Sequence, residues 1–344
     1  MTGRTQSRGG RPTMKDVAAH VGTSIKSVSR VLNGEPGVSA DTTERILRAM
    51  ADLGFRRNDL ARGLRQSDRT GTVGLVLPQA ATRYHDSLVR GLEEVARRHG
   101  SLVLTASSGT AAQERETLVS LCSRRVDGLV VVPAGTDHGF LQPEQAAGVP
   151  IVFVDRPPHG IDADLVLTDD AGGARRATSH LLEQGHRSIG VIGADAGIHT
   201  VAERLRGHRE GLTEAGLAQR RNLLRPGCET AAQAAAACLS LFASPDPPTA
   251  LFTLNNQCTI GAVRALHTLR RARSTALVGF DDFETADLLD PPVTVVAHDV
   301  GEIGRRAAAL VFGRLEGTIT GRSGSHVLPT SLTERGSGGI PPQR

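Results

Sequence analysis

Residues 14–33 read MKDVAAHVGTSIKSVSRVLN, and this stretch decides the fold of the first part of the chain. Val17 and Val21 lie one helical turn apart on one face of a first short helix, which Thr13 can cap. Gly22 can adopt the left-handed conformation that ends such a helix. Ser24 then caps a second helix. The pattern predicts two short helices joined by a tight turn.

The second helix leaves an outward face that suits contacts to DNA. A helix-turn-helix places its second helix in the major groove, where polar side chains reach base edges and phosphates. The alternative is an ordinary pair of antiparallel helices without this function. The outward residues are Ile25, Lys26, Ser27, Ser29 and Arg30.

Basic residues are concentrated at the start of the chain. Residues 1–70 contain 13 Lys and Arg against 7 Asp and Glu, whereas the other residues contain 27 against 29. A basic head on a nearly neutral body is the electrostatic pattern of a nucleic-acid-binding protein. The charge distribution therefore supports the helix-turn-helix interpretation over the ordinary helix pair.

A third helix is predicted from Ala40 to about Leu53, capped by Ser39 and ended by Gly54, with Ile46, Leu47 and Met50 facing inward. Residues 58–66 form a helix-like segment that is too short to be stable alone.

From Val73 onward, buried strand-length apolar runs alternate with helical patterns. This alternation predicts parallel sheets covered by helices, arranged as two subdomains with a cleft between them. Strands are predicted at 73–77, 102–106, 127–132, 151–154, 188–192, 250–254, 276–280 and 293–296. Helices are predicted near 84–99, 111–124, 139–148, 170–184, 201–215, 230–242, 257–270 and 300–316. The expected fold class is α/β, with a small all-α head.

Other function classes find little support in the sequence. No apolar run reaches the ~20 residues that span a bilayer, and the first ten residues lack the apolar segment of a secretory signal. Four scattered cysteines suggest reduced thiols in a cytosol. Neither metal-ligand spacing nor a nucleophile-elbow pattern occurs. We expect a cytoplasmic protein that is not an enzyme and has no cofactor and no metal.

Several short motifs, in order, resemble the lactose/galactose repressor (LacI/GalR) family of bacterial transcription regulators. The resemblance extends from about Pro12 to Gly336. The motifs are Val28-Ser-Arg-Val-Leu-Asn33, Val38-Ser39, Leu53-Gly-Phe-Arg-Arg-Asn58, Leu60-Ala-Arg-Gly-Leu64, Val154-Asp155-Arg156, Gly185-His186, Arg204-Leu-Arg-Gly207, Val278-Gly-Phe-Asp-Asp282 and Leu328-Pro-Thr.

The resemblance implies a division of labour along the chain. The expected parts are a disordered basic arm (1–11), a helix-turn-helix domain (12–57), a hinge helix and linker (58–70), an effector-binding and dimerisation domain (71–336) and a disordered tail (337–344). Within the body, subdomain 1 is expected to hold about 71–168 plus 299–325, and subdomain 2 about 169–298 plus 326–336. The body is expected to resemble periplasmic sugar-binding proteins.

The resemblance also implies the residues that bind DNA. Leu64 falls where the hinge helix of the family drives a leucine into the minor groove, although it could pack only against the body or the partner hinge. Lys26 could reach phosphate only, and Ile25 could meet a thymine methyl or the groove wall. The full expected set is Thr13, Ser24, Ile25, Lys26, Ser27, Ser29, Arg30, Asn33, Asn58, Ala61 and Leu64.

For the effector, the resemblance implies a carboxylate that accepts sugar hydroxyls and an arginine that donates to them. The expected residues are Tyr84, His85, Asp155, Arg204, Asn255, Phe280, Asp281 and His298. Any of these could instead be a strand-end residue bonded to backbone. Gln79, Arg83 and Asn256 depart from the common family pattern, and the loss of two carboxylates leaves room for a phosphorylated or acidic ligand.

The implied function is that of a repressor that leaves a near-palindromic operator when a sugar-like effector binds. The expected partners are double-stranded DNA, a small molecule that is a carbohydrate or a derivative, and a second copy of the chain, with no membrane. The protein would be associated with the nucleoid when bound to DNA. The alternatives are a regulator that needs a purine or phosphoprotein corepressor, and a solute-binding receptor.

Overall fold

The computed structural model describes residues 12–56, 69–78 and 83–343. The chain divides into two compact units, the head (residues 1–70) and the body (residues 71–344). The hinge prediction for 58–70 falls almost entirely outside the described residues, as does the basic arm.

The described residues of the head form three helices: α1 (Met14–Val21), α2 (Ile25–Asn33) and α3 (Ala40–Leu53). Each ends at a glycine in the left-handed conformation, and φ is 71° at Gly22 between α1 and α2. Ser24 caps α2 by accepting a hydrogen bond of 3.0 Å from the backbone N–H of Ser27. The predicted helix-turn-helix is therefore present, with its caps.

A small apolar core joins the three helices. Its buried residues are Val17, Ala18, Val21, Val28, Ile46, Ala49 and Met50. The prediction that Leu47 faces this core is wrong, because its side chain is 54% exposed. Ile46 and Met50 lie one turn apart on the buried stripe, whereas Leu47 is rotated out of that stripe.

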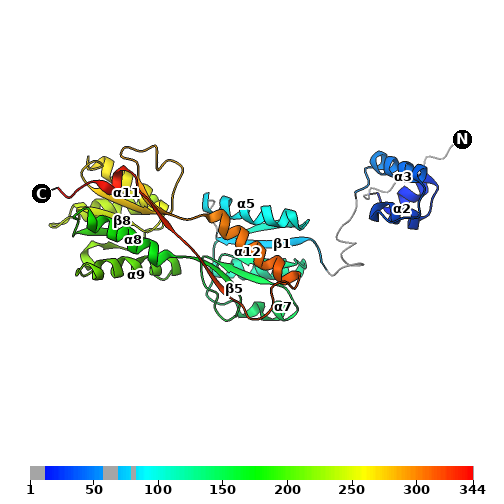
Figure 1. The fold of residues 1–344 in the computed structure, drawn as a ribbon, viewed down its shortest axis with the longest axis horizontal. Helices are drawn as coiled ribbons and strands as arrows, with labels where there is room; N and C mark the ends of the chain where they lie inside the picture. The colour runs from blue at the N-terminus through cyan, green and yellow to red at the C-terminus, as the bar shows by residue number, and fades with distance from the viewer. Residues whose placement is uncertain (1–11, 57–68, 79–82, 344) are drawn as a thin grey trace. The chain divides into compact units, whose positions relative to one another are not determined.

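The first subdomain of the body is built on a six-stranded parallel sheet (Figure 1). In spatial order its strands are β11 (Ser325–Leu328), β5 (Asp164–Thr168), β4 (Ile151–Val154), β3 (Gly128–Val131), β1 (Thr72–Pro78) and β2 (Leu102–Ser108). The helices of this subdomain are α5 (Arg83–Arg98), α6 (Ala111–Ser123), α7 (Gln142–Ala146) and α12 (Val300–Leu315), with a 3-10 turn at Gly139–Leu141.

The second subdomain repeats this plan. Its sheet runs β12 (Ser331–Thr333), β10 (Thr294–Ala297), β9 (Ala276–Phe280), β8 (Ala250–Thr253), β6 (Ile189–Ile192) and β7 (Leu224–Arg225). Only β12 is antiparallel to its neighbour. Its helices are α8 (Asp170–Glu183), α9 (His199–Glu214), α10 (Ala231–Phe242) and α11 (Asn256–Thr268), with 3-10 turns at Arg221–Leu223 and Gly336–Gly339. The predicted α/β class with an all-α head is confirmed.

The chain passes between the subdomains at three crossover segments, which follow β5, β10 and β11. The predicted subdomain boundary at residue 325 is too early, because β11 pairs with β5 in the first sheet as far as Leu328. The helix predicted at 139–148 is also shorter than expected: it is a 3-10 turn followed by the five-residue α7.

The prediction of a disordered tail at 337–344 is wrong for the described residues of that segment. Ser337 is buried: its hydroxyl donates to the carbonyl of Leu277 (2.6 Å) and accepts from the N–H of Thr294 (2.9 Å). Further along, the carbonyl of Ile340 bonds to Nε2 of His186 at 2.8 Å. Gly338 allows the tail to pack closely here, because an added Cβ would lie only 2.7 Å from Oγ1 of Thr294 on β10.

Ser337→Ala is expected to lower the free energy of unfolding by about 1–3 kcal/mol, because one buried N–H and one buried carbonyl lose their partner. Urea denaturation of the body, followed by circular dichroism, measures this. Ser331→Ala is the control, since Ser331 is exposed on β12. Equal stability of the two variants would show that the tail contributes little.

Candidate functional site

A cleft of about 760 Å³ opens between the two subdomains of the body. Pro78, Tyr84 and Asp155 line it from the first subdomain, and Arg204 and Asp281 line it from the second. Among its polar residues, Asp155 follows β4, Asp281 follows β9 and Asn255 caps the start of α11, as expected for ligand sites at the carboxyl ends of parallel strands. Seven of the eight predicted effector residues line the cleft: Tyr84, His85, Asp155, Arg204, Asn255, Asp281 and His298.

Arg204, on α9, is the most heavily bonded side chain of the cleft. Its Nε donates to Oδ1 of Asp170 (2.7 Å), and Nη1 donates to the carbonyl of Leu254 (2.6 Å). Nη1 and Nη2 donate to Oδ2 (2.9 Å) and Oδ1 (3.2 Å) of Asp281. The planar guanidinium thus holds one carboxylate on each of two sides, a geometry that lysine cannot reproduce.

This arginine is 4% exposed. Burial alone would lower its pKa, but Asp281 and Asp170 raise it, so the guanidinium stays charged. Asp170 is also buried; burial raises its pKa, and the charge of Arg204 opposes that rise. Phe280 does not line the cleft as predicted, because Arg204 covers it, with Cζ 3.7 Å from the ring centroid. Phe280 therefore supports the arginine from beneath.

Two aspartates of the cleft have strained backbones at matching places in the two sheets. Asp155 follows β4 with φ 69°, and Asp281 follows β9 with φ 66°. Residues other than glycine rarely adopt this left-handed conformation, although Asp and Asn tolerate it best. Such strain persists where the surrounding structure enforces it, often at ligand sites.

On the side of the first subdomain, the hydroxyl of Tyr84 donates to Oδ1 of Asp155 at 3.4 Å. Burial raises the pKa of Tyr84 well above its usual value, and the nearby Asp155 and Asp281 carboxylates raise it further, so the phenol stays protonated. Oδ2 of Asp155 lies 3.7 Å from Nε of Arg156. The ring of His85 contacts Tyr84 edge-on, with centroids 5.7 Å apart.

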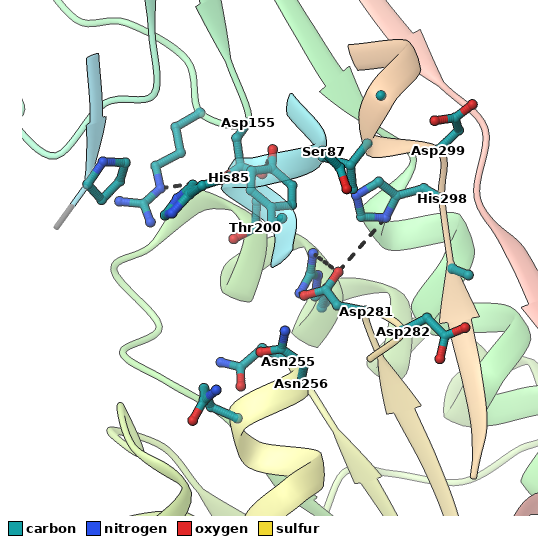
Figure 2. Close-up of a pocket in the computed structure, with 18 of the residues that line it drawn as sticks. His85, Ser87, Asp155, Thr200, Asn255, Asn256, Asp281, Asp282, His298 and Asp299 are labelled. Atoms are coloured by element: carbon teal, nitrogen blue, oxygen red, sulfur yellow. Dashed lines mark hydrogen bonds and ion pairs between the residues drawn. The ribbon is translucent and has the colours of Figure 1, made fainter. Parts of the chain in front are cut away.

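His298 lies at the crossover segment after β10, and Figure 2 shows it facing Asp281. Its side chain is 4% exposed, and its Nδ1 is 3.9 Å from Oδ1 of Asp281, beyond hydrogen-bond distance. This buried nitrogen has no hydrogen-bond partner within the described part of the chain. Asn255 caps α11 through Oδ1, which accepts from the N–H of Cys258 at 2.8 Å, so part of its role is structural.

The DNA-binding prediction concerns the exposed face of α2. Ile25 is 43% exposed and Lys26 is exposed, while Ser29, Arg30 and Asn33 are half-buried. Ser24 and Ser27 bond to each other through their hydroxyls at 2.9 Å. Thr13 lies at the N-terminus of α1, where its backbone N–H donates to Asp16 at 2.7 Å. Asn58, Ala61 and Leu64 lie outside the described residues.

Asp170, the second carboxylate on Arg204, is not among the predicted residues, because no motif contains it. Glu229, which lines the cleft from the loop before α10, is also absent from the predicted set. By contrast, Arg156 could have been included, because it stands in the Val154-Asp155-Arg156 motif that marked Asp155.

A helix-turn-helix head before a two-subdomain body with a polar cleft defines the class of ligand-responsive DNA-binding regulators. Comparison with known proteins agrees. Residues 13–58 match the family model for bacterial regulatory proteins of the lacI family, and residues 70–327 match the model for periplasmic binding proteins and the sugar binding domain of the LacI family. The chain belongs to the LacI family of transcriptional regulators.

Individual relatives match over nearly the whole chain. The transcriptional regulator CelR of Thermobifida fusca is 32% identical over 338 residues, covering 95% of this chain and 98% of CelR. A solved complex of CelR with cellobiose is 31% identical, with a TM-score of 0.71, and covers 95% of this chain and all of CelR. The Lac repressor dimer bound to operator and an anti-inducer is 25% identical, with a TM-score of 0.85, covering 96% of this chain and 99% of that one.

Proposed function

We propose that this protein is an operator-binding repressor that releases DNA when a carbohydrate or carbohydrate derivative occupies the cleft of the body. The observation that carries the proposal is the ion pair between buried Arg204 and partly buried Asp281, which faces Tyr84 and Asp155 across the cleft. A ligand that bridges the two sides can favour one arrangement of the subdomains. Such a ligand shifts the DNA-binding equilibrium by its difference in affinity for the two arrangements.

The charges of the cleft favour an uncharged ligand with many hydroxyl groups. Arg204 is already shared between Asp170 and Asp281. Arg305, at the rim, is shared among Glu94, Asp299 and Glu302. Carboxylates outnumber guanidinium groups among the described lining residues, so hydroxyl donors are matched better than phosphate groups. The described lining residues with these charges are Glu94, Asp155, Glu229, Asp281, Asp282 and Asp299 against Arg90, Arg156, Arg204 and Arg305.

DNA is bound by the head, and we propose that two copies of the chain act together. A homodimer presents two copies of α2, which suits a near-palindromic operator. The body is proposed to form the dimer, with the segment 58–70 as the hinge and Leu64 as its minor-groove wedge. The Lac repressor structure, a dimer on its operator, supports this arrangement.

Operator binding in the presence and absence of sugars tests the proposal. Binding sites are first selected from random DNA with the purified protein. Neutral mono- and disaccharides, including cellobiose, and their phosphates are then screened by thermal shift and by release of the selected DNA. Release by a neutral sugar supports the proposal. Tighter DNA binding with a ligand would instead favour a corepressor, and failure to select any DNA sequence would overturn the proposal.

Asp281→Asn is expected to bind operator normally but to need on the order of tenfold or more effector for release. Asparagine tolerates the left-handed backbone of this position, so the fold should be kept, while the carboxylate that accepts ligand hydroxyls is lost at a cost of about 1–3 kcal/mol. Titration of operator release against the sugar from the screen measures this. Asp287→Asn is the control, because Asp287 is exposed and does not line the cleft. A normal release curve for Asp281→Asn would place the effector elsewhere.

A further inference from the structure

One arginine outside the cleft holds two of the three crossover segments together. Arg176, on the second turn of α8, donates through Nη2 to the carbonyl of Thr330 at 2.8 Å and also contacts the Thr330 hydroxyl. Its Nη1 and Nη2 each lie 3.4 Å from Oδ2 of Asp169. Asp169 belongs to the crossover after β5, and Thr330 belongs to the crossover after β11.

The two crossovers are also joined directly. The N–H of Asp169 donates to the carbonyl of Leu328 at 2.9 Å, and the Thr330 hydroxyl lies 3.1 Å from the carbonyl of Asp169. Oδ1 of Asp169 accepts from the N–H of Gly172 at 2.9 Å, which fixes the start of α8. Thr330 is buried. The first turns of α8 and both crossovers therefore form one bonded unit, which we call the crossover clamp (Asp169, Arg176 and Thr330).

The crossover clamp is connected to the cleft through two consecutive residues of the chain. Asp169 binds Arg176 of the clamp, and the following residue, Asp170, binds Arg204 in the cleft. Arg204 in turn binds Asp281, the carboxylate proposed to accept effector hydroxyls. Because Asp169 and Asp170 are consecutive in the chain, these contacts form a continuous path from Arg204 to the crossover clamp.

We propose that Arg176 is a positioning residue that couples occupancy of the cleft to the angle between the subdomains. The inference rests on the proposed function. Arg176 does not line the cleft and is not expected to touch the effector. Arg176 holds the crossovers after β5 and β11 at a fixed distance from α8. A shift of Arg204 then rotates one subdomain relative to the other as a rigid unit, because the connecting segments between them do not deform. Coupling of this kind is a free energy between two sites and is measured as a ratio of affinities.

The test compares Arg176→Gln with Arg175→Gln. Arg175 precedes Arg176 on α8 and bonds Glu214 at 3.3 Å, with both side chains about half exposed, so it controls for the loss of one charge on this helix. Operator affinity is measured with and without the sugar from the screen, for which cellobiose is the first probe, and sugar affinity is measured by calorimetry without DNA. For Arg176→Gln we expect sugar affinity within about twofold of the original protein, but a ratio of operator affinities reduced by about fivefold or more.

Hydrogen exchange provides a readout that needs no sugar. The amide of Asp169 should exchange about tenfold faster in Arg176→Gln than in Arg175→Gln, because its bond to Leu328 depends on the clamp. Thr330→Val, which removes the hydroxyl from the other end, should act in the same direction.

The outcomes separate the inference from the function on which it rests. If the unchanged protein does not respond to any sugar, the proposed function fails, and hydrogen exchange still decides whether the clamp exists. Unchanged coupling or unchanged exchange in Arg176→Gln would overturn the inference. An equal loss of coupling in Arg175→Gln, or a loss of sugar affinity equal to the loss of coupling, would also overturn it.

Discussion

Arg204→Met is expected to lower the free energy of unfolding of the body by about 3–5 kcal/mol, because the buried Asp170 carboxylate and the partly buried Asp281 carboxylate lose their counter-charge. It should also abolish the response to effector at any sugar concentration that releases the original protein. Both effects have one cause: a single guanidinium holds the two carboxylates and the Leu254 carbonyl at once. Urea denaturation and operator-release titrations measure them separately.

Three further variants test whether the loss of stability comes from the unpaired carboxylates. Arg204→Lys keeps the charge but cannot reach all the acceptors, so its stability should fall between those of the original protein and Arg204→Met. Adding Asp170→Asn to Arg204→Met should recover part of the lost stability, since one unpaired buried charge is removed. Arg206→Met, at an exposed site on the same helix that pairs with Glu203 and Glu210, should cost less than about 1 kcal/mol. A similar cost for Arg204→Met and Arg206→Met would contradict the account.

Arg30→Ala is expected to weaken operator binding by about 1–3 kcal/mol, or roughly 5- to 150-fold, and to relax the base preference at one operator position. The reason is that an arginine on the recognition helix can bond a guanine edge through two donors. Lys26→Ala should instead weaken binding to all sequences and flatten the dependence on salt, if its contact is to phosphate only. Arg30→Ala is therefore expected to lower the preference for operator over random DNA, whereas Lys26→Ala is expected to leave that preference unchanged.

Competition between operator and random DNA at two salt concentrations distinguishes these effects. Arg48→Ala is the control, because Arg48 is on α3, where its exposed side chain pairs with Glu44. If both α2 variants bind operator as well as Arg48→Ala does, the recognition face lies elsewhere on the head.

The sequence predicted the central strands well because they carry uninterrupted apolar residues. β4 and β8 are buried at every position, so their hydrophobic runs are unmistakable. The edge strands β11 and β12 lack this signal, because all their residues are exposed or half-buried. β5 was missed for a similar reason, since it begins with Asp164, whose carboxylate bonds Arg314 at 2.8 Å. These strands form because a neighbouring strand offers hydrogen-bond partners, which local composition does not reveal.

The tail was predicted to be disordered, but its described residues pack against the body. Its glycines and prolines are typical of disorder, but the decisive group is one serine hydroxyl that fits between Leu277 and Thr294. The site was predictable where family motifs carry it, as at Asp155, Arg204 and Asp281. Asp170 and Arg176 could not be predicted, because their roles depend on partners 34 and 154 residues away in the sequence.

The three crossovers also determine the order in which the chain can be completed during synthesis. The head is a continuous segment with its own core, so it can fold as soon as it leaves the ribosome. Neither sheet of the body is complete at that stage, because β11 and β12 are encoded last among the strands. A nascent or truncated chain can therefore present a folded head without a finished body. If the body makes the dimer, as proposed, paired heads are expected only after β11 and β12 have been added to the two sheets.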